Sequence, residues 1–295
     1  MKINTAMRAA AVAAAVGGVL TVASPASVAL PGSFGALVPS TFVTQYNTVD
    51  LPTEGVGSGS VACPSGMALV SAGGLAAGLS SITPSPGYTG TTVTGRAERG
   101  TSLRIVVAEA TCAPVSQFAG TTIATGRDQR AHSDLGEWTQ TISCPAGMRA
   151  FGGGGYFKTS TGAVSKDGYN LSANSVTLNG RGWTVSAVNH TFSDALVVTT
   201  RCAPQSSSTR LVEEIYPITP QRGASSGSAN GYAHCPAGHL PISGGAQITQ
   251  DGTAEPSGSI LSDSVLVENG QLGWHASGSS GGEHAELHVV ALCGS

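Results

Sequence analysis

Three runs of apolar residues, mostly β-branched or small, recur along the chain, each about as long as a β-strand. They cover 103–110, 195–200 and 285–292, and each ends just before a cysteine. β-Branched residues in runs of this length favour strands. Stretches rich in glycine and serine separate the apolar segments, which is typical of short strands joined by turns. The pattern predicts an all-β protein.

A fourth apolar stretch lies at the start of the chain and has a different character. Lys2 and Arg8 are its only early charges, residues 9–22 are uncharged, and Ser27-Val28-Ala29 follows. A basic start, a short apolar segment and a small-x-small tripeptide indicate an export signal, cleaved after Ala29. The segment is shorter than the roughly 20 residues that a membrane span needs. We expect a secreted, extracellular protein without a membrane span.

Composition and charge narrow the class of partner. Charged residues make up 11% of the chain and glycine 41 of its 295 residues, which disfavours exposed helices. The formal net charge of −3 falls by two, to −5, once Lys2 and Arg8 are removed. Only Lys158 and Lys166 remain as lysines, and the arginines are scattered. This pattern argues against nucleic acid as a partner.

The strongest signal is a threefold repeat built around six cysteines. One motif, C-P-x-G, begins each copy, and a glycine follows ten residues after its cysteine. The motifs begin at Cys63, Cys144 and Cys235, the glycines are Gly73, Gly154 and Gly245, and the second cysteines are Cys112, Cys202 and Cys293. The expected organisation is a signal peptide (1–29), an apolar extension (30–39) and repeat units 40–114, 115–204 and 205–295, which form one domain.

The first copy departs from the other two. Trp183 and Trp274 each lie nineteen residues before the second cysteine, where the first copy has Val93. The first copy is also nine residues shorter between its cysteines, so we expect it to have lost a hairpin near the missing tryptophan. Each unit is expected to form an antiparallel sheet of three or four strands. Such a sheet cannot bury its apolar face alone, so the three should pack around a shared core.

An even number of cysteines in an exported chain indicates disulfides. Pairing within each repeat gives Cys63–Cys112, Cys144–Cys202 and Cys235–Cys293. The rival scheme joins neighbouring repeats through Cys112–Cys144, Cys202–Cys235 and Cys63–Cys293. The first scheme is simpler because it closes each repeat on itself, and non-reducing peptide mapping would separate the two.

The triplicated C-P-x-G motif, with its later cysteine and Gly-Trp element, resembles vitelline membrane outer layer protein I. In that family three Greek-key sheets form the faces of a β-prism. The resemblance covers residues 40–295 and implies a fold of three pseudo-symmetric antiparallel sheet units, stapled by disulfides. It implies no activity.

Residue types associated with catalysis or metal binding are present without a convincing pattern. Residues 223–227 match the G-x-S-x-G nucleophile motif, but they lie in a Ser/Gly-rich loop rather than between a strand and a helix. Five histidines of the third copy, His234, His239, His275, His284 and His288, are crowded enough to suggest zinc, although oxidation of Cys235 would remove its thiolate. We expect no catalytic residue, no metal and no cofactor.

Two kinds of partner remain open. Trp183 and Trp274 are either core residues or platforms on which sugar rings stack, as in a lectin. The extension carries Phe34, Leu37 and Val38, which are unusual in a solvated tail and suggest docking to a partner protein. The tail and the triplicated units together resemble the linker subunit of Streptomyces umbrella toxin particles, which joins a repeat-containing toxin to a lectin subunit. That resemblance implies a non-enzymatic adaptor in antibacterial competition.

Overall fold

The computed structural model describes eleven stretches of the chain: 41–51, 55–97, 104–129, 136–159, 161–165, 170–189, 195–205, 209–220, 225–255, 257–268 and 271–295. The signal peptide and the extension, with Phe34, Leu37 and Val38, lie outside them. The described chain is built from strands and two short 3-10 helices. No helix in these stretches is long and apolar enough to cross a membrane.

The same series of strands occurs three times. The first copy has β1 (Val43–Asp50), β2 (Gly55–Ala62), β3 (Met67–Leu75), β4 (Gly78–Pro84), η2 (Pro86–Tyr88), β5 (Gly90–Ala97) and β6 (Ile105–Pro114). The second has η3 (Val115–Phe118), β7 (Thr122–Gln129), β8 (Gly136–Ser143), β9 (Met148–Lys158), β10 (Asn170–Val176), β11 (Gly182–Asn189) and β12 (Ala195–Pro204). The third has β13 (Arg210–Ile218), β14 (Gly227–His234), β15 (Leu240–Gln250), β16 (Thr253–Ala254), β17 (Ser259–Glu268), β18 (Gln271–Ser280) and β19 (Ala285–Gly294).

These strands form three antiparallel sheets, as predicted, but the sheets do not coincide with the sequence repeats. The orders are β1-β6-β3-β17-β18-β14, β13-β19-β15-β10-β11-β8 and β2-β5-β4-β9-β12-β7, with β16 added beside β15. Each repeat therefore gives three strands to one sheet and three to the next. The prediction that one repeat forms one sheet of three or four strands is wrong, because each repeat has six principal strands and completes its sheets only with strands of its neighbours.

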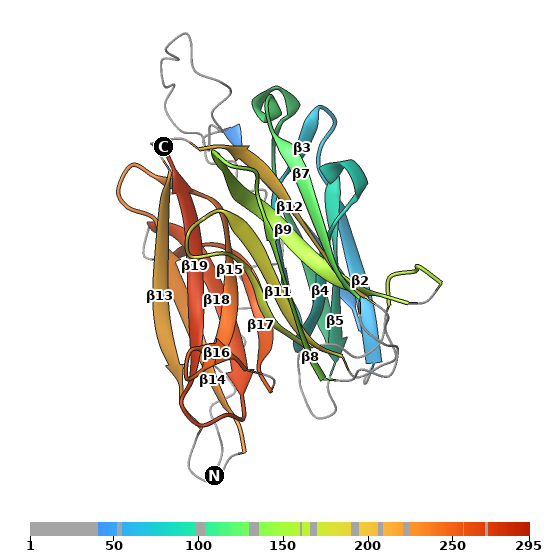
Figure 1. Ribbon diagram of the computed structural model, residues 1–295, viewed down its shortest axis with the longest axis vertical. Coiled ribbons are helices and arrows are strands. Elements are labelled where there is room, and N and C mark those ends of the chain that lie inside the picture. The colour runs from blue at the N-terminus through green and yellow to red at the C-terminus, as the bar shows by residue number, and fades with distance from the viewer. Residues whose placement is uncertain are drawn as a thin grey trace.

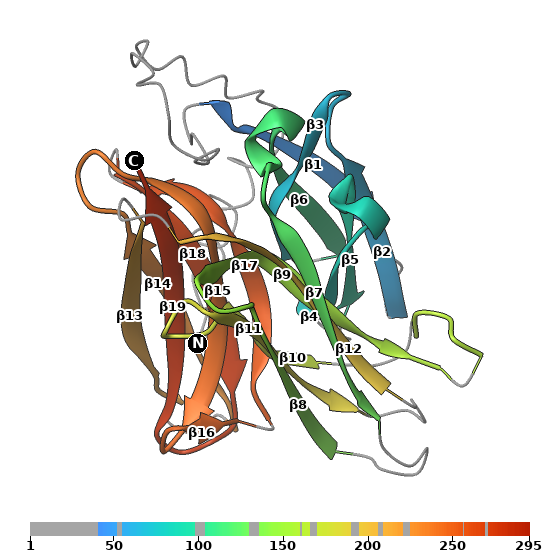
Figure 2. The same cartoon turned by 45° about the horizontal axis from the view of Figure 1, so that its top comes forward.

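The three sheets surround a common core in a prism-like arrangement. Figures 1 and 2 show the strands of the third copy (orange to red) on one side and those of the first copy (blue to teal) on the other. At each corner the first two strands of one copy lie side by side in different sheets: β1 with β2, β7 with β8, and β13 with β14. The main core cluster contains buried side chains from all three copies, including Leu69, Leu196 and Leu287.

The glycine ten residues after each first cysteine allows the sheets to join. An added Cβ would lie 2.3 Å from the Asp263 carbonyl oxygen at Gly73, 2.0 Å from that of Ile82 at Gly154, and 2.2 Å from that of Asn174 at Gly245. In each case the carbonyl belongs to a strand of another repeat. Only glycine permits so close an approach of two backbones. The repeating glycine is therefore a consequence of how the repeats share sheets.

The C-P-x-G motif forms a turn, as predicted, and the cysteines pair within each repeat. Gly66, Gly147 and Gly238 have φ of 79°, 78° and 81°, the left-handed region that favours glycine. The bonds are Cys63–Cys112, Cys144–Cys202 and Cys235–Cys293. Each one ties this turn to the last strand of its own repeat.

The shortening of the first copy lies elsewhere than expected. Only residues 76–77 connect β3 to β4, whereas residues 159–169 connect β9 to β10. The next connection has five residues in both copies, 85–89 and 177–181, so nothing is missing beside the tryptophan position. Thr91, rather than Val93, occupies that position: it pairs with Val61, just as Trp183 pairs with Ile142.

Candidate functional site

The two repeat tryptophans are core residues. Trp183 and Trp274 are each 1% exposed. The Trp183 indole N–H donates a hydrogen bond to Asn174 Oδ1 at 3.0 Å, and that of Trp274 donates to Asp263 Oδ1. Buried indoles with a polar partner are stable core elements. These rings offer no face to a sugar, so the core alternative holds for both.

Two carboxyl groups are buried beside these tryptophans. Asp263 is fully buried, and burial raises its pKa to about 7 although hydrogen bonds from Trp274 and Asn174 lower it. Burial also raises the pKa of Glu109 to about 8, and Glu109 accepts a hydrogen bond from the Val265 backbone N–H at 3.2 Å. Both groups lie inside the protein, so they serve the packing of the sheets rather than a ligand.

The five histidines of the third copy do not form one cluster, although His234 and His275 both lie against the ring of Tyr232. His275 is on β18, His284 precedes β19, and His288 is on β19 in a different sheet from His275. His239 follows the Cys235 turn, and Cys235 is disulfide-bonded. Among the described residues no three His, Cys, Asp or Glu side chains are placed to hold a metal ion. The crowding in the sequence therefore does not produce a metal site in this part of the chain.

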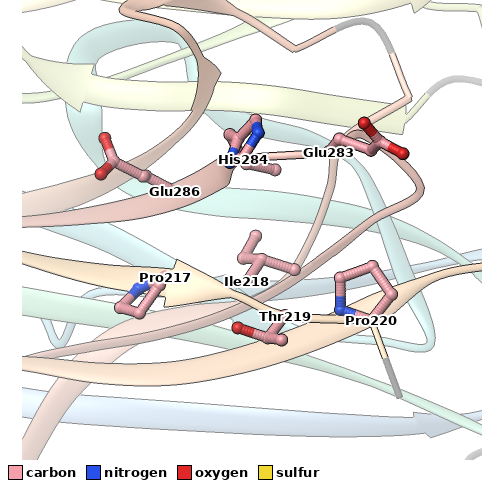
Figure 3. Close-up of a pocket in the computed structure, with 8 residues that line it drawn as sticks. Pro217, Ile218, Thr219, Pro220, Glu283, His284 and Glu286 are labelled. Carbon is pink, nitrogen blue, oxygen red and sulfur yellow. The ribbon is translucent and has the colours of Figure 1, made fainter. Parts of the chain in front are cut away.

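A pocket of about 490 Å³ lies where β13 ends and β19 begins. Figure 3 shows its two walls: Pro217, Ile218, Thr219 and Pro220 on one side, and Glu283, His284 and Glu286 on the other. Ile218 is 2% exposed and forms an apolar base, while Glu283 and His284 are exposed. The pocket thus combines an apolar wall with an acidic rim, a combination that suits a cationic segment carrying an apolar side chain.

His284, in one wall of the pocket, has an unusual backbone conformation. Its φ is +59°, a left-handed conformation that costs a side-chain-bearing residue about 1 kcal/mol relative to glycine. Gly281 and Gly282 lie three and two residues before it, with Glu283 between them and His284. Strained backbone of this kind occurs more often at binding sites than elsewhere.

Beside the pocket, three strands are tied together by His288. Its Nδ1 lies 2.8 Å from Glu213 Oε1 on β13, and its Nε2 lies 2.9 Å from Thr249 Oγ1 on β15. Because a carboxylate oxygen accepts hydrogen bonds, Nδ1 donates to Glu213. Glu286, on the pocket rim, lies 3.7 Å from the same Nε2.

This acid–histidine–hydroxyl chain has the connectivity of a catalytic triad, but its hydroxyl is poorly placed for attack. Thr249 is only 5% exposed and lies in the middle of a sheet. At that exposure its hydroxyl is covered by neighbouring side chains and is not open to a substrate carbon. The arrangement is therefore a tie between neighbouring strands. In the G-x-S-x-G motif Ser225 is an exposed bend residue, and Gly223 and Ala224 lie outside the described stretches.

Sequence reasoning did not find the pocket. Its two walls are separated in the chain by most of the third repeat, and they meet only because β13 pairs with β19. The class that the fold and this pocket define is an all-β, disulfide-bonded protein of three shared sheets. No protein-family model matches the chain, and no curated protein is similar to it in sequence.

Proposed function

We propose that this chain is a secreted, non-enzymatic adaptor that joins two other extracellular proteins. An adaptor needs two separate contact surfaces. The pocket between β13 and β19 supplies one, and the apolar extension supplies the other. The pocket carries the proposal, because its apolar wall and acidic rim suit a protein segment better than a small reactive substrate.

The first surface extends from the pocket along the edge strand β13. Glu213, Ile215 and Pro217 occupy alternate positions of β13, so they share one side of the strand, the side of His288 and Glu286 on β19. Ile215 is 50% exposed, unusual for a large apolar side chain. Together these residues and the rim glutamates fit a segment that carries lysine or arginine next to an apolar residue.

A small apolar cluster lies at the end of β13 that is away from the pocket. Val70, Phe151 and Ile242, each seven residues after a first cysteine, form a small core cluster on which Phe42 packs. The extension 30–39, which we propose as the second surface, lies outside the described residues and ends three residues before Phe42 in the sequence. Leu211, which also packs on this cluster, and Ile218 in the pocket lie about 24 Å apart along β13. The cluster and the pocket are therefore separate places on the body.

From the resemblance to the umbrella toxin linker, we further propose a toxin and its lectin subunit as the two partners, and antibacterial competition as the setting. The disulfide-bonded body supports an extracellular location. Nothing else in the proposal depends on those identities.

Affinity purification from culture supernatant, followed by mass spectrometry, tests the adaptor proposal. The bait is the full secreted chain with a C-terminal tag. One variant combines Phe34→Ala, Leu37→Ala and Val38→Ala; another combines Glu283→Lys and Glu286→Lys. Asp50→Lys is the control, since it introduces a lysine at an exposed carboxylate of the first copy, away from β13.

We expect the tail variant and the rim variant to lose different co-purifying proteins and the control to lose none. If the rim variant still recovered every protein that the wild-type bait recovers, the proposed role of the pocket would be contradicted. A wild-type bait that recovers no protein at all would contradict the adaptor itself.

A further inference from the structure

The outer face of the third copy differs from its two counterparts at one pair of positions. Tyr232 on β14 pairs across the strands with His275 on β18. In the first copy the equivalent pair is Ser60 and Thr92, two hydroxyls 2.8 Å apart. In the second copy the equivalent pair is again two hydroxyls, on Thr141 and Thr184, also 2.8 Å apart. Only the third copy replaces a hydroxyl pair with two aromatic rings.

A third ring extends this pair, and we call Tyr232, His234 and His275 the aromatic face. The rings of Tyr232 and His234 are stacked within 3° of parallel, with centroids 5.9 Å apart. The rings of Tyr232 and His275 are 4.7 Å apart and tilted by 45°. All three residues are partly exposed.

Hydrogen bonds hold the aromatic face in place. The buried hydroxyl of Ser262 lies 3.3 Å from His275 Nδ1 and 2.6 Å from the Ser277 hydroxyl. At the corner of the prism, the Tyr216 hydroxyl donates to the Tyr232 carbonyl oxygen at 2.8 Å and accepts from the Tyr232 N–H at 3.1 Å. A ligand would therefore find these rings already ordered, which lowers the entropic cost of binding.

Uncharged polar groups continue the same rows of side chains. Ser228 and Asn230 precede Tyr232 on β14, and Ser277 and Ser279 follow His275 on β18, so that Ser228 pairs with Ser279 and Asn230 with Ser277. The face thus joins aromatic rings to a row of hydroxyl and amide groups. Burial lowers the pKa of His275 to about 4, which keeps its ring uncharged at neutral pH.

We propose that the aromatic face is a carbohydrate-binding site for a neutral polysaccharide. The apolar C–H face of a sugar ring stacks on an aromatic ring, and sugar hydroxyls exchange hydrogen bonds with serine and asparagine side chains. Two rows of side chains face outward here, one on β14 within 228–234 and one on β18 within 275–279. Neither row carries a lysine or arginine, so a polyanion is a poor fit. The open surface of a sheet suits a long chain better than a single sugar.

This site is separate from the pocket and does not depend on the adaptor proposal. It lies on the sheet that contains β14 and β18, whereas the pocket lies beside β13 and β19 of another sheet. An adaptor could use such a face to hold the complex on a cell wall, and the site would function equally without partners.

Titration of the full secreted chain with four neutral hexasaccharides tests the proposal: cellohexaose, chitohexaose, laminarihexaose and maltohexaose. The variant Tyr232→Ser with His275→Thr recreates the pair Ser60 and Thr92 that the first copy already contains, so the sheet should tolerate it. The control variant Ser60→Ala with Thr92→Ala changes the equivalent place in the first copy. Circular dichroism and the melting temperature confirm that each variant is folded.

We expect the wild-type chain and the control to bind at least one of the four sugars with a Kd of about 1 mM or tighter, and the aromatic variant to bind it at least tenfold more weakly. Tighter binding to a longer polymer of the same sugar would support the extended face. Absence of binding to all four sugars would overturn the proposal, as would equal affinity of a folded aromatic variant.

Discussion

Asn174 donates a hydrogen bond from Nδ2 to Asp263 Oδ2 at 3.0 Å, which joins the second and third repeats inside the core. Each of the two residues also accepts an indole N–H, from Trp183 and from Trp274 respectively. The result is a continuous polar chain between two repeats. Asn174 and Asp263 occupy equivalent positions in their sheets. Each lies on the strand that pairs with the next repeat, beside the glycine that allows the two backbones to approach closely.

Asp263→Asn should destabilise the protein although it removes a buried charge. The amide of the new asparagine can accept from Trp274 but would present N–H groups to the Asn174 amide, so one buried donor loses its partner. We expect a loss of about 1–3 kcal/mol in the free energy of unfolding, measured by urea titration. Asp251→Asn, at an exposed turn, is the control and should change stability by less than about 0.5 kcal/mol. An unchanged midpoint for Asp263→Asn would contradict the hydrogen-bond chain.

Stability should fall as the pH rises from about 6.5 to about 8.5. The raised pKa values of Glu109, about 8, and Asp263, about 7, mean that the folded state holds more protons than the unfolded state, whose carboxyls titrate near pH 4. The stabilisation is complete below pH 4 and is lost as the pH passes the folded values. His275, with its lowered pKa, has the opposite effect below about pH 6.5, so the upper window isolates the acids.

Differential scanning calorimetry at pH 6.5 and 8.5 checks this expectation. The melting temperature should be several degrees lower at the higher pH, and Glu109→Gln should reduce the difference. A wild-type melting temperature that rises over this interval would show that the buried carboxyls are ionised.

Gly154→Ala should be far more damaging than Gly59→Ala. The added methyl group at Gly154 would overlap the Ile82 carbonyl oxygen at 2.0 Å, whereas at Gly59 it would make an ordinary contact of 3.5 Å with Val49. We expect Gly154→Ala to cost about 3 kcal/mol or more, or to prevent secretion of a folded chain. Chemical denaturation of both variants measures the difference. Similar midpoints would mean that the strands of neighbouring repeats do not approach this closely.

Loss of a single disulfide should weaken the protein without changing its fold. Replacing Cys144 and Cys202 with alanine opens a loop of 58 residues, and we expect a loss of about 2–5 kcal/mol. Thermal unfolding under non-reducing conditions measures this effect. A non-reducing peptide map of the wild-type chain is the companion experiment, since recovery of a peptide joining Cys112 to Cys144 would contradict pairing within repeats.

The features that sequence could predict are those set by neighbours along the chain. Pro64 and Gly66 form a turn because of their own φ preferences, and the register of the repeats was enough to choose the pairing of Cys63 with Cys112. The all-β class follows in the same way from strand-length runs of β-branched residues. By contrast, the predicted position of the residues missing from the first copy was wrong. Counting back from Cys112 cannot show which connection between strands became shorter.

Alternation along a strand identifies which side chains are buried, but it does not identify the neighbouring strand. By itself the sequence therefore determined the threefold repeat, its turns, the last strand of each copy and the disulfides. Only the tertiary structure decided that each repeat is divided between two sheets, because that division depends on contacts such as Gly73 against Asp263, far apart in the chain. The burial of Trp183 and Trp274, the pocket between β13 and β19, and the aromatic face around Tyr232 all depend on the same long-range pairing.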